Sequence, residues 1–314
     1  MNSSSTFELS RTILGRDACL VAVAALFLGF AAPTYAAGKL DQKVIADASG
    51  AAATTTPDGI VKIGWSRTDV AVTVDGMKLP PAAGLGSWAA FAPVANGAIV
   101  MGDTVVFEDE VDAAMDAAFA HGLSVTAVHN HFFHDTPKVY FMHLGGEGKP
   151  GTLAAGVSAV WSAIRAVRSA HPQPATSFGD QMPTAGHVDA GVIGHIVGQP
   201  ATDSQGVVKT TIGRAGTMHG ITVGGSMGLT TWAAFSGSDA LAAMDGDFIM
   251  TAEEAQPVLH ALRRNDVHIV ALHSHMMGEQ PSFYFTHFWA VGKAADLARA
   301  FRAALDAQAA ARKS

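Results

Sequence analysis

Three histidines stand within one short, otherwise largely apolar stretch, VHNHFFHDTPKVYFMHLGGEG, residues 128–148. Their spacing is H-x-H, then eleven other residues, then a third histidine, and it returns in LHSHMMGEQPSFYFTHFWAVG, residues 272–292. The six histidines are His129, His131, His143, His273, His275 and His287. Neutral imidazole is a common ligand for zinc and copper. The sequence therefore indicates a metal-binding motif that is present in two copies.

The spacing suits a β-hairpin that gathers all three imidazoles on one face. Side chains alternate faces along a strand, so His129 and His131 point the same way. Directly opposed residues of an antiparallel hairpin also share a face, and His143 has the parity needed to join them if the turn lies at residues 136–138. We therefore expect each triad to converge on a single point.

A divalent cation would resolve the electrostatics of such a cluster. Three packed imidazoles repel one another when they are protonated, and when they are buried and neutral their N–H groups still need partners. Three imidazoles at about 2.0–2.1 Å from an ion, with an open fourth position, are the usual catalytic zinc arrangement. The predicted cofactor is a divalent metal ion, with zinc favoured and copper as the alternative.

Four acidic residues are candidates for a catalytic base. Asp135 and Glu279 fall in the predicted hairpin turns, where they could be a fourth ligand, a general base or simply turn residues. Glu110 and Glu254 open a predicted helix, where an acidic side chain already stabilises the helix dipole. Whether the protein is an enzyme therefore stays open at this stage.

Other functions fit the same residues. A copper or zinc carrier without catalysis needs the same histidines, and alternation sends Met277 to the histidine face as a softer ligand. A module that binds a small molecule without metal would instead use Arg67, Arg214 and the recurring tryptophans. Each arginine could also hold a structural carboxylate.

The histidine motifs are part of a longer internal repeat. WAAF occurs at Trp88 and at Trp232, and Gly-Asp follows at residues 102–103 and 246–247. From the tryptophan to the third histidine the two copies align without a gap. The predicted boundaries are a first repeat domain at 37–170, a linker at 171–187 and a second repeat domain at 188–314.

Each repeat has the same predicted order of elements. A short helix near residues 41–48 is followed by strands that include GIVKIGW and VAVTVDG, whose alternation suits half-buried sheet. A helix, the histidine hairpin and a closing Ala-rich helix complete the repeat. The predicted fold class is α+β, with two tandem homologous domains, each a mainly antiparallel sheet with packed helices, related by a pseudo-twofold axis.

The N-terminal segment has the pattern of an export signal. Arg11 and Arg16 precede the apolar run ACLVAVAALFLGFAA, which ends near the small-residue site at Ala36. Residues 1–36 are therefore predicted to be a cleaved signal peptide, which places the mature protein in the periplasm or outside the cell. The single cysteine, Cys19, would be lost with the signal, so no disulfide would stabilise the mature chain.

Charge and composition narrow the predicted partners. A formal net charge of −7 gives no electrostatic reason to expect nucleic acid, which normally requires a basic face. No further apolar run is long enough to span a bilayer, so no membrane contact is expected after signal cleavage. The expected partners are a metal ion and, in the alternative function, a small-molecule ligand.

Several of these segments resemble a known family. GDTVVFEDEV, the first histidine stretch and LHSHMMGEQPSFYFTHFWAVGKAADLARAFRAAL are similar to the LppY/LpqO family of exported bacterial proteins, which contain a duplicated domain of unknown function. The resemblance covers nearly all of the predicted mature chain. It implies a lipoprotein in mycobacteria, and the position of Cys19 before the apolar run departs from that. It implies no particular activity.

Overall fold

The computed structural model describes residues 38–313, so the predicted signal peptide lies outside the described residues. The helices are α1 (Gln42–Ser49), α2 (Val111–Ala120), α3 (Pro150–Ala170), α4 (Ala190–Val197), α5 (Ala252–Arg263) and α6 (Ala294–Ala311). Short 3-10 turns are η1 (Pro81–Ala83), η2 (Glu108–Glu110) and η3 (Gly225–Met227). The strands of the first half are β1 (Ala53–Thr55), β2 (Val61–Ser66), β3 (Thr73–Val74), β4 (Met77–Lys78), β5 (Gly86–Val94), β6 (Gly97–Phe107), β7 (Ser124–His129), β8 (Asp135–Thr136) and β9 (Val139–Gly148). Those of the second half are β10 (Ala201–Ser204), β11 (Val207–Gly213), β12 (Gly216–Met218), β13 (Ile221–Val223), β14 (Thr230–Gly237), β15 (Ala242–Met250), β16 (His268–His273) and β17 (Tyr284–Gly292).

Most strands belong to one antiparallel sheet, in the order β1-β2-β5-β6-β9-β7-β16-β17-β15-β14-β11-β10. The first six strands in this order come from the first half of the chain and the other six from the second half. A bridge between Val128 of β7 and Leu272 of β16 connects them. The order within each half is equivalent, so the predicted fold class, two tandem α+β repeats with a mainly antiparallel sheet, is confirmed.

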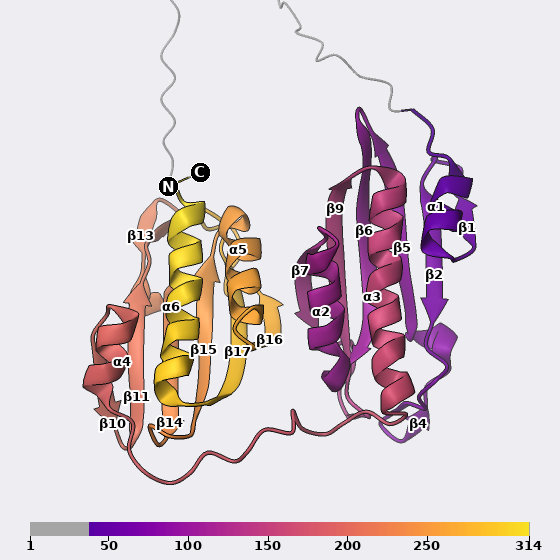
Figure 1. Ribbon diagram of the computed structural model, residues 1–314. Helices are drawn as coiled ribbons and strands as arrows, with labels where there is room; N and C mark the ends of the chain where they lie inside the picture. The colour runs from indigo at the N-terminus through magenta and orange to yellow at the C-terminus, as the bar shows by residue number, and fades with distance from the viewer. Residues whose placement is uncertain (1–37, 314) are drawn as a thin grey trace, which may run out of the picture. The chain divides into compact units, whose positions relative to one another are not determined.

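In each half the helices lie on one face of the sheet (Figure 1). Helices α2 and α3 pack on the strands β6, β7 and β9, and α5 and α6 pack on β15, β16 and β17. Alternate strand positions point toward these helices, and residues such as Val106, Met142 and Phe248 form the main core with them. The face away from the helices is where the predicted histidine sites must lie.

Side-chain caps fix where several helices begin. Asp41 and Asp189 accept hydrogen bonds from the first turns of α1 and α4. Thr251 and Glu254 form a capping box at the start of α5, which begins at Ala252 although Pro257 lies inside it. No helix in the described part of the chain is long and apolar enough to cross a membrane.

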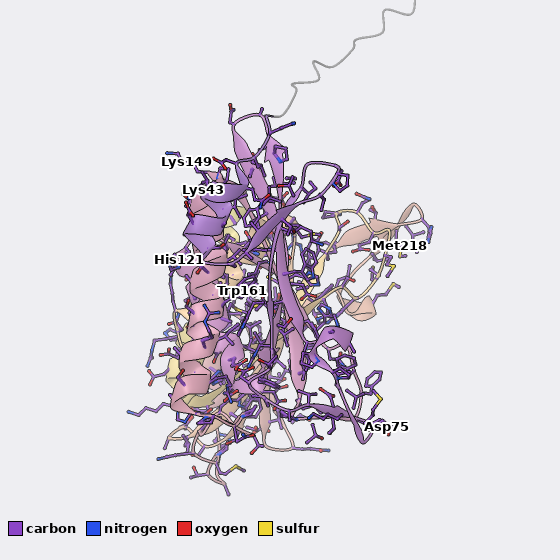
Figure 2. The ribbon with its side chains drawn as sticks, turned by 90° about the vertical axis from the view of Figure 1, so that its right-hand side faces the viewer. Lys43, Asp75, His121, Lys149, Trp161 and Met218 are labelled. Carbon is purple, nitrogen blue, oxygen red and sulfur yellow. The ribbon has the colours of Figure 1, made fainter. Side chains whose placement is uncertain are left out.

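The segment VAVTVDG differs from its prediction as a strand of the main sheet. Only Thr73–Val74 is extended, and it pairs with β4 and β8 in a separate small sheet. The reason is the Asp75-Gly76 turn, in which both residues have positive φ, the geometry of a tight hairpin. Figure 2 shows Asp75 at the tip of this hairpin, on the side of the sheet away from α3.

A buried ion cluster joins helices to sheet in the first repeat. Both oxygens of Glu110 accept hydrogen bonds from Arg67, at 2.7 and 2.9 Å, and one also accepts from the backbone N–H of Phe107. The Nε atom of Arg168, from α3, lies 2.6 Å from the same carboxylate. Of the two predicted roles of Arg67, holding a structural carboxylate is the one that this contact shows.

The second repeat has an equivalent cluster around Glu254. Its carboxylate pairs with Arg214 and, at 2.6 Å, with the Nε of Arg312. It also accepts a hydrogen bond from the Nε2 of Gln308 at 3.0 Å and from the backbone N–H of Thr251. Burial opposes ionisation, but the hydrogen bonds from Arg214 and Arg312 lower the pKa of Glu254 to about 2.

This pKa predicts a pH-dependent contribution to stability. Because the pKa of Glu254 is lower in the folded chain than its ordinary 4.5, its charge stabilises the fold above pH 4.5 and that contribution is lost as the pH falls toward 2. We expect Glu254→Gln to lower the free energy of unfolding by about 3 kcal/mol at neutral pH and by much less near pH 2. Urea titrations at both pH values measure the difference. Glu253→Gln, at an exposed neighbouring position, is the control and should change little. An equal loss of unfolding free energy at both pH values would contradict the low pKa of Glu254.

Candidate metal centre

Strand register places the first histidine triad beside an aspartate. On β6 and β9, Asp103 lies directly opposite His143, and on β7 and β9, His129 lies opposite Phe141. Opposed residues share a face, so these side chains all lie on the face away from the helices. His131 follows two residues after the end of β7 and stacks on Phe141, with ring centroids 3.3 Å apart.

In the first triad His129 lies close to both of the other histidines. The Nε2 atoms of His129 and His131 are 3.2 Å apart. The rings of His129 and His143 stack with centroids at 5.1 Å. Ligands of a tetrahedral ion at about 2.0–2.1 Å are roughly 3.3 Å from each other, so the nitrogen separation already matches one edge of such a site.

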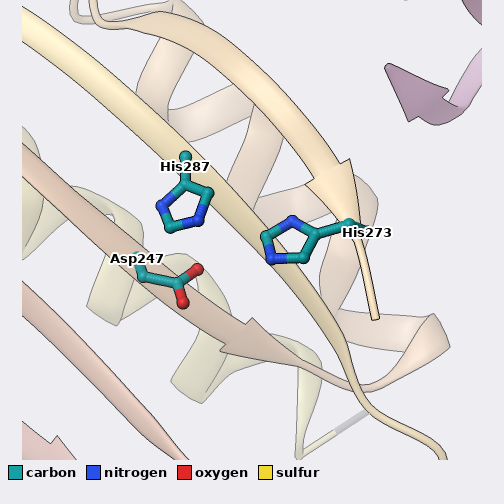
Figure 3. A group of neighbouring side chains, drawn as sticks. All are labelled: Asp247, His273 and His287. Atoms are coloured by element: carbon teal, nitrogen blue, oxygen red, sulfur yellow. The ribbon is translucent and has the colours of Figure 1, made fainter. Parts of the chain in front are cut away.

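The second triad repeats this arrangement with closer contacts. Asp247 lies opposite His287 on β15 and β17, and one potential ligand atom from each of Asp247, His273 and His287 falls within 4.8 Å of the other two (Figure 3). The Nε2 of His275 is 3.2 Å from the Oδ2 of Asp247. Asp247, His273 and His287 therefore form one cluster, and His275 contacts the same aspartate.

The two aspartates were not among the residues predicted from the sequence. Asp103 and Asp247 recur at the same position in the two repeats, within the Gly-Asp pairs. The two residues are 8% and 3% exposed. Recurrence of an acidic residue in register with the histidines was the signal that could have identified them.

Several buried polar atoms at these sites have no hydrogen-bond partner among the described residues. They are the Oδ1 atoms of Asp103 and Asp247 and the Nδ1 atom of His273. An unpaired buried carboxylate oxygen or imidazole nitrogen costs about 1–3 kcal/mol. One carboxylate oxygen of the aspartate is unpaired in both repeats, and a cation bound by these donors would satisfy it.

The electrostatics keep His273 in the neutral form that can bind metal. Burial, followed by the nearby imidazoles of His287 and His275, lowers the pKa of His273 to about 4. Burial raises the pKa of Asp247, although both of those histidines oppose the rise. In the first repeat burial likewise lowers the pKa of His129. Neutral imidazoles at physiological pH retain the lone pair that a metal requires.

One ring orientation in the second repeat is fixed by the backbone. The Nδ1 of His287 lies 3.1 Å from the carbonyl oxygen of Gly246, to which it can donate a hydrogen bond. This contact leaves the Nε2 lone pair for a ligand, as second contacts of metal-binding histidines commonly do. The ring of His275 stacks on Phe285 with centroids 3.4 Å apart, as His131 does on its own phenylalanine.

The four acidic candidates for a base have other partners in the structure. Asp135 accepts a hydrogen bond from the backbone N–H of Val139 at 2.7 Å, and Glu279 accepts one from Phe283 at 2.9 Å. Glu110 and Glu254 belong to the ion clusters at the helix starts. A catalytic role for any of these residues stays a prediction.

The replacement of His134 by Gly278 in the second repeat has a backbone explanation. Both positions have positive φ, at 58° and 92°, a conformation in which glycine is favoured. His134 is exposed there. The backbone conformation of this turn therefore explains why glycine can replace histidine here.

A family model described as Domain of Unknown Function (DUF1259) matches residues 43–163 and again residues 192–307. Each match contains one complete triad with its aspartate. No curated protein matches the chain.

Three solved structures show a weak similarity. They are the ethanolamine utilization protein EutL from Leptotrichia buccalis C-1013-b (15% identity, 68% of this chain and 82% of that chain, TM-score 0.20), EtuB from Clostridium kluyveri (11%, 82% and 90%, TM-score 0.21) and the trimeric bacterial microcompartment shell protein PduB (9%, 80% and 88%, TM-score 0.19). These TM-scores are too low to support any conclusion about fold or function.

The environment of His273 predicts its titration in metal-free protein. We expect its ring to stay neutral until the pH falls to about 4, well below the value of about 6.5 for an unfolded chain. Because the folded state binds this proton less readily, the residue should weaken the fold as the pH drops from 6.5 toward 4. Imidazole NMR signals recorded against pH measure the midpoint. A midpoint near 6.5 would contradict the packed geometry.

Proposed function

We propose, on the premise that this chain belongs to the family of the Domain of Unknown Function (DUF1259), that each of its two repeats binds one divalent transition-metal ion. The donors in the first repeat are His129, His131, His143 and Asp103. Those in the second repeat are His273, His275, His287 and Asp247. We further propose that the protein acts after export, as the N-terminal pattern suggests.

The unpaired aspartate oxygens carry this proposal. A buried carboxylate beside three imidazoles is stabilised by a positive charge, and in each repeat the Oδ1 of the aspartate has no partner within the described chain. A bound cation would supply that charge. It would take one of the two ring nitrogens of His273, Nδ1 or Nε2, as a ligand. Three imidazole nitrogens and one carboxylate suit zinc better than magnesium or calcium, which prefer oxygen ligands.

The site lies where a substrate could reach it. His131 is exposed, and so is the turn that follows it. Trp88 lies directly opposite Asp103 on the neighbouring strand, with Lys62 over its ring at 5.4 Å. A zinc ion that accepts a fifth ligand would supply Lewis-acid chemistry to a small substrate on this face.

A carrier of copper is the second candidate, and the second repeat favours it. Met276 and Met277 follow His275 directly, and Met277 is 87% exposed. Thioether sulfur is a ligand that prefers Cu(I). If this function is correct, Met277→Ala should remove a preference for Cu(I) over zinc at the second site.

Metal stoichiometry tests the main proposal. We expect the untagged mature protein to bind two zinc ions, with His131→Ala removing one and His275→Ala the other. The two affinities should differ, because Asn130 and His134 of the first site are Ser274 and Gly278 in the second. Calorimetric titration of metal-free protein and elemental analysis measure both numbers.

His171→Ala is the matched control, because it removes an exposed histidine outside the triads. It should leave both binding steps unchanged. A single step that either triad variant abolishes would mean one shared site. Less than about 0.2 equivalents of any transition metal would exclude the proposal.

A further inference from the structure

A cavity of about 170 Å³ lies in the second repeat, beside the ion cluster of Glu254. Residues from β11 and α6 line it, among them Ile212, Leu305 and Gln308. Three arginines also line it: Arg214, Arg302 and Arg312. This cavity is formed by other residues than the histidine and aspartate donors.

The equivalent place in the first repeat is filled by aromatic rings. Trp65 and Trp161 correspond to Ile212 and Leu305 in the aligned repeats. The two tryptophan rings lie 6.0 Å apart, and the guanidinium of Arg165 lies over Trp65 at 5.1 Å. Figure 2 shows Trp161 between α3 and the sheet. Loss of both indoles in the second repeat therefore accounts for the cavity.

In the first repeat three arginines are matched by three carboxylates. Arg67 and Arg168 are paired with Glu110, Asp69 and Asp109, and Arg165 lies over Trp65. All of these ion pairs are buried or partly buried. The cluster needs no further anion.

In the second repeat the arginines outnumber the carboxylates. Five residues separate Arg67 from Thr73, but two separate Arg214 from Thr217, and this shorter loop has no counterpart of Asp69. The counterpart of Asp109 is an exposed glutamate. An additional arginine, Arg302, has appeared on α6 in place of a serine.

The resulting cluster contains three arginines against two carboxylates. The carboxylates are Glu254, which pairs with Arg214 and Arg312, and Asp306, which pairs with Arg302 at 2.6 Å. Arg312 contacts Glu254 through its Nε, which leaves its two terminal nitrogens as donors for a ligand. Positive charge that is not balanced at the wall of a cavity favours an anion.

We propose that this cavity is a binding site for a small oxyanion, a carboxylate or a phosphate. The arginines supply charge and paired N–H donors, and such groups recognise both kinds of oxyanion. Ile212 and Leu305 supply an apolar wall for the remainder of a small ligand. The site is independent of the proposed metal centres.

Calorimetric titration with inorganic phosphate and, separately, with succinate tests this proposal on metal-free protein. We expect at least one of the two anions to bind the wild type. The anion that binds more tightly shows whether the site prefers a phosphate or a carboxylate. Arg302→Gln should weaken binding by about tenfold. Ile212→Trp combined with Leu305→Trp, which restores the residues of the first repeat, should abolish binding.

Arg299→Gln is the control, because it removes an exposed arginine of the same helix that pairs with Asp296 and does not line the cavity. It should bind like the wild type. If the double tryptophan variant does not fold, comparing the anion affinities of Arg302→Gln and Arg299→Gln still tests the proposal. Absence of binding at millimolar anion, or an equal loss in both arginine variants, would overturn the proposal. Metal stoichiometry is measured separately, so either proposal can fail alone.

Discussion

The antiparallel register of three neighbouring strands is the constraint on which both candidate sites depend. It places Asp103 of β6 opposite His143 of β9, and brings His129 of β7 next to them. A slip of one residue on any strand would turn its donor to the opposite face. That slip is opposed by the core, since Val106 and Met142 would then leave the helix face where they are buried. Apolar burial therefore determines the geometry of the polar site.

The two repeats have kept this register and have diverged elsewhere. Asp247 and His287 are paired in the second repeat as their counterparts are in the first. On the helix side, by contrast, Trp161 has become Leu305, Asp69 has no counterpart and Ser158 has become Arg302. Residues on the helices can vary because they do not set strand pairing. The sheet therefore preserves the donors while the helix side is free to acquire a different cavity.

The sequence allowed the histidines to be placed because their geometry is local. Parity along one hairpin decides which face His129 and His143 share, and the hairpin connects them directly. Asp103 reaches the same point through β6, whose pairing with β9 joins residues about 40 apart and cannot be read from alternation alone. The prediction of a sheet strand at VAVTVDG likewise rested on alternation alone. Its alternation is real, but the Asp75-Gly76 turn ends the strand after two residues.

The Gly-Asp pair shows how packing and chemistry are joined within one dipeptide. A Cβ atom on Gly246 would lie 2.2 Å from the ring of Phe288 and 2.4 Å from the carbonyl oxygen of Trp232, so only glycine fits there. Phe288 lies directly opposite Gly246 on β17 and packs in the main core, next to the pairing of Asp247 with His287. The aspartate is held by packing that forms whether or not a cation is present. A metal would then meet donors that are already placed, and little of its binding free energy would be lost in ordering them.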